Sequence, residues 1–229
     1  MGTNMKYNEI NQTIGEIVVS NPEAIQIFKE YSIDYCCGGN RLLIDVMKEQ
    51  GLGEELLVRL EQARERRKDS YQVDRFDSMS PEVLSTYIED THHAFLRRSL
   101  PETAELLATI LRVHGKNHME LFDVYRLFGQ MKTDLEQHLM KEETMIFPEI
   151  TEKNAKSEWI ALMEEILREH EAVGDILRRL REITDNYTVP EGVCYTFRQT
   201  YVNLEEIEKD LHQHIHLENN ILFSEYRSK

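Results

Sequence analysis

The feature that most constrains the fold of this chain is an internal repeat of a histidine and a glutamate four residues apart. The ten residues His138–Phe147 match His214–Phe223 in the first histidine, the glutamate at the fifth position and the closing phenylalanine. A single histidine precedes each copy, His93 by 45 residues and His170 by 44 residues. The chain is therefore predicted to contain two similar halves, each supplying one histidine and one His-x-x-x-Glu pair.

Each half has the pattern of a helical hairpin. Apolar residues recur at three- and four-residue steps, which predicts long helices at about 81–113, 117–149, 156–185 and 191–226. The midpoints between the paired histidines fall at Gly115 and Gly192, and glycine suits a helix end and a tight connection. Pro101 is expected to kink the first of these helices. The predicted fold class is all-α, an antiparallel four-helix bundle preceded by a small helical domain.

The N-terminal part has the pattern of a separate helical module. Thr13 and Glu16 form a capping-box pattern, and Asn21 precedes a proline at a first helical position, so two short helices are expected to begin there. Two more helical stretches follow at about 40–50 and 54–68. The predicted boundaries are 1–68 for this domain, 69–79 for an aperiodic linker and 80–229 for the bundle.

The repeated side chains fall where core residues belong. The apolar stripes through the last three bundle helices include Leu135, His138, Glu142 and Met145; Ile166, His170 and Val173; and Leu211, His214, Glu218 and Ile221. The first helix is ambiguous, because His92 continues the stripe of Ile88 whereas His93 shares one with Leu100 and Leu107. The spacing of the repeat favours His93.

The other histidines and two neighbours of the repeated glutamates are expected to lie elsewhere. His114 shares the stripe of His93 but stands beside the turn, which gives it at most an outer role. Glu143 and Asn219 are predicted to point away from the repeated residues by helical phase. The remaining histidines fall off the stripes and are predicted to be surface residues: His92, His118, His212 and His216.

Six polar groups buried in one layer require positive charge. An unpaired carboxylate or imidazolium would cost several kcal/mol to bury. No lysine or arginine lies on these stripes at that height. Two His-x-x-x-Glu pairs and two further histidines suit a site for two ions bridged by the glutamates. Imidazole and carboxylate without thiolate fit iron, manganese or zinc. The predicted ligands are His93, His138, Glu142, His170, His214 and Glu218.

Adjacent cysteines form a second candidate site. Cys36 and Cys37 precede Gly38 and Gly39, which are predicted to leave both sulfurs accessible near a helix start that favours thiolate. Neighbouring cysteines make a strained disulfide, so reduced thiols with a redox or metal-handling role are the functional interpretation. A buried pair of small apolar residues is the alternative. Cys194 is expected to be inert.

Composition excludes several classes of protein. The formal net charge of −15 disfavours binding to nucleic acid. No apolar stretch reaches the roughly 18 to 20 residues of a membrane helix, and the start lacks a secretory pattern, so a cytoplasmic protein without membrane partners is expected.

These motifs together resemble a known family. The bundle with its paired His-x-x-x-Glu motifs resembles a hemerythrin-like domain, and its union with the segment Asp34–Gly39 is similar to the bacterial di-iron proteins that repair iron-sulfur clusters. The resemblance covers about 7–68 and 80–226. It implies a non-haem site of two iron ions with an oxo or hydroxo bridge, in which Glu142 and Glu218 are the bridging carboxylates.

The resemblance also implies a function. The expected role is repair of iron-sulfur clusters damaged by oxidative or nitrosative stress, through iron donation, with damaged iron-sulfur proteins as partners. Oxygen species and nitric oxide are further expected ligands, and a homodimer is compatible with the sequence. Two alternatives stay open: a nitric oxide or peroxide reductase in which Cys36 and Cys37 supply electrons, and a sensor that binds oxygen or nitric oxide. Whether the protein is an enzyme depends on which of these holds.

Overall fold

The structure is a computed structural model that describes residues 10–68, 76–152, 157–224 and 226. The described residues form helices, with one isolated bridge between Thr13 and Leu42, so the all-α prediction is confirmed. The chain divides into two compact units, Met1–Ser80 with Ile215–Lys229 and Pro81–His214. The end of the last helix is thus grouped with the N-terminal residues, a division that the sequence did not predict.

The first unit contains four short helices at the predicted places. They are α2 (Ile14–Ser20), α3 (Ala24–Glu30), α4 (Leu43–Gln50) and α5 (Glu55–Lys68), followed by a short 3-10 turn, η1 (Phe76–Ser78). The capping box is confirmed, because the Glu16 amide donates to the Thr13 hydroxyl and the Thr13 amide donates to the Glu16 carboxylate. The rest of the predicted linker, 69–75, lies outside the described residues.

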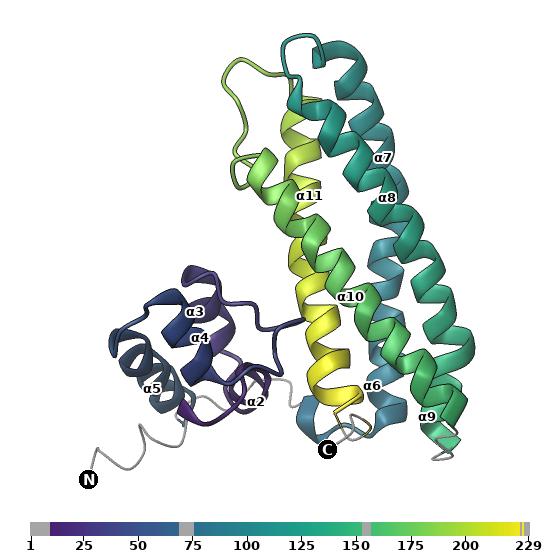
Figure 1. The fold of residues 1–229 in the computed structure, drawn as a ribbon. Helices are drawn as coiled ribbons and strands as arrows, with labels where there is room; N and C mark the ends of the chain where they lie inside the picture. Colours follow the sequence, from purple (N-terminus) through teal and green to yellow (C-terminus); the bar gives the residue numbers. More distant parts are fainter. Residues whose placement is uncertain (1–9, 69–75, 153–156, 225, 227–229) are drawn as a thin grey trace. The chain divides into compact units, whose positions relative to one another are not determined.

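The long helices of the bundle occur where the repeat predicts them. The first comprises α6 (Pro81–Ile88), η2 (Glu89–His93) and α7 (Ala94–His114), and the second comprises α8 (Glu120–Lys141), η3 (Glu142–Ile146) and α9 (Phe147–Glu152). The third is α10 (Ser157–Ile183), and the fourth comprises α11 (Tyr195–Leu217) and η4 (Glu218–Leu222). Figure 1 shows α7, α8, α10 and α11 running side by side.

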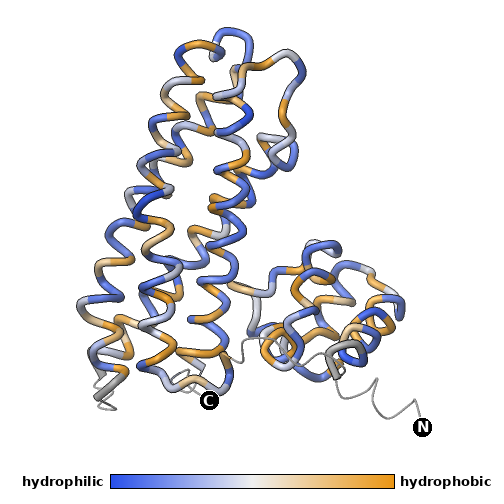
Figure 2. Tube along the Cα trace, turned by 180° about the vertical axis from the view of Figure 1, so that it is seen from behind, coloured by the Kyte–Doolittle hydropathy of each residue, from blue (hydrophilic) through white to orange (hydrophobic). Residues whose placement is uncertain are grey.

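The connections fall at the predicted glycines. Gly115 directly follows α7, and Gly192 lies between α10 and α11 with a φ of +76°, a conformation that favours glycine. Helix α7 continues through Pro101 without a break. Hydrophobic and hydrophilic residues alternate along each bundle helix (Figure 2), as amphipathic helices require. No helix among the described residues is long and apolar enough to cross a bilayer.

Three of the long helices contain a π-helical turn. The turns η2, η3 and η4 each hold one residue more than an α-turn would, which advances the helical phase. After Glu142, Ile146 is fully buried whereas Met145 is 51% exposed, and after Glu218, Leu222 is buried whereas Ile221 is only half-buried. The core positions predicted for Met145 and Ile221 were therefore wrong, because the prediction assumed α-helical phase throughout.

The same deviation explains the ambiguity in the first bundle helix. Ile88 lies on the core side before η2, and Leu100 and Leu107 lie on it afterwards. A π-turn joins these two stripes, and within it both His92 and His93 are buried. The sequence pattern could not separate His92 from His93 because the π-turn places both of them on the core side.

Candidate metal centre

The six repeated side chains are all buried, each at most 2% exposed. His138 lies near the end of α8, His170 in the middle of α10 and His214 near the end of α11. The others occupy π-helical turns, His93 at the end of η2, Glu142 at the start of η3 and Glu218 at the start of η4. Turns of this kind recur at functional sites, because they rotate a side chain relative to the regular helix.

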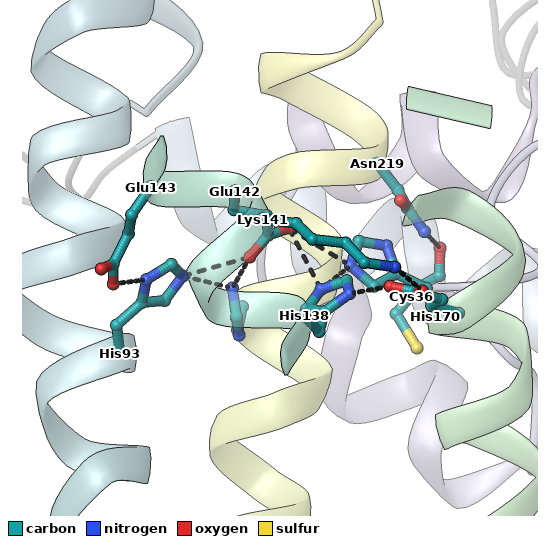
Figure 3. A network of polar contacts seen from close by, with 10 residues as sticks. Cys36, His93, His138, Lys141, Glu142, Glu143, His170 and Asn219 are labelled. Atoms are coloured by element: carbon teal, nitrogen blue, oxygen red, sulfur yellow. Dashed lines mark hydrogen bonds and ion pairs between the residues drawn. The ribbon is translucent and has the colours of Figure 1, made fainter. Parts of the chain in front are cut away.

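Two pairs of imidazoles face the carboxylate of Glu142. The Nε2 atoms of His138 and His170 are 3.0 Å apart, and they lie 3.1 and 3.7 Å from Glu142 Oε1. The Nε2 atoms of His93 and His214 are 3.2 Å apart, and they lie 3.4 and 4.0 Å from Glu142 Oε2. Each oxygen of one carboxylate therefore serves one pair of imidazoles (Figure 3).

Glu218 completes both groups. It follows His214 by one helical turn, and potential ligand atoms of Glu218, Glu142 and either histidine pair all lie within 4.8 Å of one another. The residues predicted as ligands thus form two four-residue groups that share both glutamates, His93 with His214 and His138 with His170.

The spacing within each imidazole pair fits a shared ion. Two nitrogens bound to one ion at about 2.1 Å and at right angles are about 3.0 Å apart, close to both observed separations. Among the described residues, no lysine or arginine forms an ion pair with Glu142. The buried donors support a metal site, and the donor set suits iron.

Two outer carboxylates orient the imidazoles. Glu143 Oε1 lies 2.7 Å from His93 Nδ1 and also pairs with Arg97, and Glu169 Oε2 lies 2.8 Å from His138 Nδ1. Such contacts hold a proton on Nδ1 and leave Nε2 available as a ligand atom. Glu143 was predicted to point away, and this was wrong because η3 changes the helical phase after Glu142. The outer role of Glu169, which precedes His170, was not foreseen from the sequence.

The charges of the protein groups in the site support each other. Burial lowers the pKa of His138, but the carboxylates of Glu142 and Glu169 outweigh it and raise the pKa to about 9. Hydrogen bonding from His138, together with Lys141, lowers the pKa of Glu169 to about 2 despite partial burial. A proton on His138 thus supplies positive charge that a bound cation would replace, since metal binding releases protons from its ligands.

Two histidines predicted to be at the surface are buried. His92 is 2% exposed, with Nδ1 2.9 Å from Asp210 Oδ1 and its ring parallel to that of His214 at a centroid distance of 5.6 Å. His216 is 5% exposed, and burial lowers its pKa to about 4. The helical-phase argument failed for His92 because of η2, and for His216 because that face of the helix packs on residues of the first unit such as Tyr35.

The other three histidines lie outside the cluster. His118 and His212 are half-buried rather than fully exposed. His114 stands beside the turn after α7, with Nε2 3.2 Å from the sulfur of the exposed Cys194.

The cysteine segment differs from its predicted chemistry. Cys36 is buried, Cys37 is half-buried, and neither forms a disulfide, although their sulfurs are 3.8 Å apart. The Cys36 thiol donates to Asp34 Oδ1 at 3.2 Å. Hydrogen bonding to Cys37 and burial raise the pKa of Cys36 well above its usual range, and α4 begins only at Leu43. The expectation of an accessible thiolate at a helix start was therefore wrong for Cys36. The sulfurs and Asp34 Oδ1 still form a group able to hold a metal ion.

Comparisons with known proteins agree with this geometry. Residues 84–226 match the hemerythrin HHE cation binding domain, and residues 10–64 match a domain of unknown function, DUF542. The chain is 32% identical over 218 residues to the iron-sulfur cluster repair protein YtfE of Yersinia pseudotuberculosis, covering 93% of this chain and 95% of that protein. It is 33% identical over 215 residues to a probable iron-sulfur cluster repair protein of Haemophilus influenzae, with coverages of 93% and 95%. It is 28% identical over 218 residues to the iron-sulfur cluster repair protein ScdA of Staphylococcus haemolyticus, with coverages of 93% and 96%.

The outer carboxylates generate a first prediction. Glu143→Gln and Glu169→Gln should each weaken metal binding about 10–100-fold, because an amide holds the imidazole tautomer less firmly than a carboxylate does. Competition with a metal-binding dye would measure the affinity. Glu136→Gln, an exposed change on α8, is the matched control, and equal affinities in all three variants would contradict an orienting role.

Proposed function

Because this chain belongs to the hemerythrin HHE cation-binding family, we propose that its buried histidines and glutamates hold two iron ions for the repair of iron-sulfur clusters. The clusters are those damaged by oxidative or nitrosative stress, and repair proceeds by donation of iron from this site. Relatives that cover more than nine-tenths of the chain carry the name of iron-sulfur cluster repair proteins. Damaged iron-sulfur proteins in the cytoplasm are the proposed partners.

The observation that carries the proposal is the position of the Glu142 carboxylate. Its two oxygens face different imidazole pairs, at 3.1 and 3.7 Å on one side and 3.4 and 4.0 Å on the other. A carboxylate that faces two pairs of imidazoles suits a bridge between two ions. Glu218 belongs to both four-residue groups and would supply the second bridge.

The donor set also suits a site that gives up its metal. Each ion would have two imidazoles and one oxygen from each glutamate, which leaves coordination positions for another ligand or an acceptor. No thiolate belongs to either group, so the donor set differs from the cysteine thiolates that hold an iron-sulfur cluster. When bound, the iron is the cargo of the proposed reaction. The protein orients the imidazoles through Glu143 and Glu169 and excludes bulk water by burial.

Removal of a ligand should lower the iron content. Glu142→Ala or His214→Ala should reduce iron affinity by more than the approximately 10–100-fold expected for loss of an outer partner. Elemental analysis of freshly purified protein, with its absorption spectrum, would measure the loss. His212→Ala is the control, because this half-buried histidine is on α11 with His214 but outside both four-residue groups. Similar losses in all three variants would overturn the assignment of ligands.

Transfer of iron to a damaged cluster is the direct test of function. Iron-loaded protein is mixed with an iron-sulfur protein whose cluster was damaged by peroxide or nitric oxide, and both cluster recovery and iron content are followed. Recovery with a matching loss of iron is the expected result. Turnover of nitric oxide or peroxide without iron loss would instead support the reductase, and a ligand-dependent shape change with neither outcome would support the sensor.

A further inference from the structure

Two asparagines near the end of the chain hold the cysteine segment. Asn219 Nδ2 donates to the carbonyl oxygen of Cys36 at 3.2 Å, and Asn220 Nδ2 donates to the carbonyl oxygen of Tyr35 at 3.2 Å. All four residues belong to one compact unit. Figure 3 shows the Asn219 amide directed at the main chain of Cys36. The main chain of the cysteine segment is therefore bound at two successive carbonyls.

Two glycines make room for the Asn220 amide. A Cβ at Gly15 would lie 2.4 Å from Asn220 Oδ1, and a Cβ at Gly39 would lie 2.5 Å from the same oxygen. The Gly15 amide also donates to the Gly39 carbonyl at 2.7 Å. Gly39, the second glycine of the cysteine motif, thus allows close packing against Asn220. From the sequence, this glycine was instead predicted to keep the cysteine sulfurs accessible.

The contacts of Asn220 fix its orientation. Its Nδ2 also lies 2.9 Å from His216 Nδ1, so both of its hydrogens have an acceptor. The ring of His216 lies edge-on to Tyr35 at a centroid distance of 6.0 Å and is buried. The amide cannot rotate without the loss of a buried hydrogen bond, which makes this contact specific.

The bound segment covers a thiol. Cys36 is 4% exposed, and its sulfur lies against Asp34 Oδ1 and the sulfur of Cys37. A reagent or partner thiol reaches this sulfur only after the segment moves. The hydrogen bonds from Asn219 and Asn220 oppose that movement.

The asparagines lie in the same π-helical turn as a proposed metal ligand. Asn219 directly follows Glu218, and both belong to η4 (Glu218–Leu222). A movement of the Glu218 side chain that shifts the backbone of η4 therefore also shifts the side-chain amides of Asn219 and Asn220. The first half of the repeat has Glu143 and Thr144 at the corresponding positions, so this arrangement is specific to the second half.

We propose that Asn219 and Asn220 couple the exposure of the Cys36 thiol to occupancy of the metal site. The inference rests on the proposed function, because Glu218 must bind iron. With iron bound, Glu218 is fixed, η4 is ordered and the asparagines hold the cysteine segment over the Cys36 sulfur. When iron leaves, η4 loosens and the thiol becomes accessible. Coupling of this kind is reciprocal, so the held segment also favours retention of iron.

The test measures the reactivity of a single thiol. Cys37→Ser and Cys194→Ser leave Cys36 as the only cysteine, and its alkylation by iodoacetamide is followed by mass spectrometry in iron-loaded and metal-free protein. Iron should slow alkylation on the order of tenfold, within the range typical of coupled sites. The double variant Asn219→Asp/Asn220→Asp keeps the side-chain size but removes both donors. It should react rapidly in both states, with a remaining difference below about twofold.

A control and a second measurement separate coupling from general damage. Asn40→Asp makes the same type of substitution, with one added negative charge instead of two, at an exposed position of the same segment and should behave as the parent protein does. The double variant should also release iron to a chelator faster, by a factor similar to the lost protection of the thiol. Helix content measured by circular dichroism should be the same in all proteins.

The possible failures are distinguishable. Equal alkylation rates in loaded and metal-free parent protein, with iron content verified, would overturn the coupling and leave the proposed function intact. A difference that persists in the double variant would overturn the role of the asparagines. If the parent binds no iron, the proposed function and the coupling both fail, and the double variant in metal-free protein then decides whether the asparagines cover the thiol at all.

Discussion

The structure depends on the burial of two carboxylates and four imidazoles in a bundle core. Glu142 and Glu218 are fully buried, and the six groups lie too close together to be accommodated as unrelated polar residues. Buried carboxylates are tolerated when positive charge or donors stand beside them. The imidazoles provide that environment, and two of them, His93 and His138, are oriented by carboxylates that keep contact with Arg97 and Lys141. Outward from the cluster, these imidazoles are therefore followed by carboxylates and the carboxylates by surface cations.

This constraint accounts for the irregular turns. In a regular α-helix, the histidine and the glutamate of each His-x-x-x-Glu pair share one face. The residues three and four positions after the glutamate would then lie on that same face. The turns η3 and η4 begin at the two glutamates, and η2 ends at His93. Each π-turn rotates the following helix by about one residue, so Glu142 or Glu218 points inward while Ile146 or Leu222 still reaches the core. The less regular helix costs some stability, and the inward direction that it gives to the side chains of the site offsets this cost.

Much of this could be predicted from the sequence. The duplicated His-x-x-x-Glu motif, the helix boundaries near Gly115 and Gly192 and the capping box at Thr13 are local or strictly periodic signals, and the structure has these features. The burial of His92, the inward contact of Glu143 and the exposure of Met145 could not be predicted, because each depends on a π-turn that leaves no distinct mark in the sequence. The state of Cys36 depends on residues 180 or more positions away, which periodicity within one helix does not address.

The two halves of the repeat have diverged at the residue that follows each glutamate. In the first half this residue is Glu143, whose carboxylate holds His93 Nδ1 and therefore serves the cluster. In the second half it is Asn219, whose amide holds the main chain of Cys36 instead. A carboxylate could not replace Asn219, because it has no hydrogen to donate to a carbonyl oxygen, and an amide could not fully replace Glu143, because it lacks the charge that favours the imidazole proton. One duplicated turn thus provides an outer partner for the cluster in the first half and an attachment for the cysteine segment in the second.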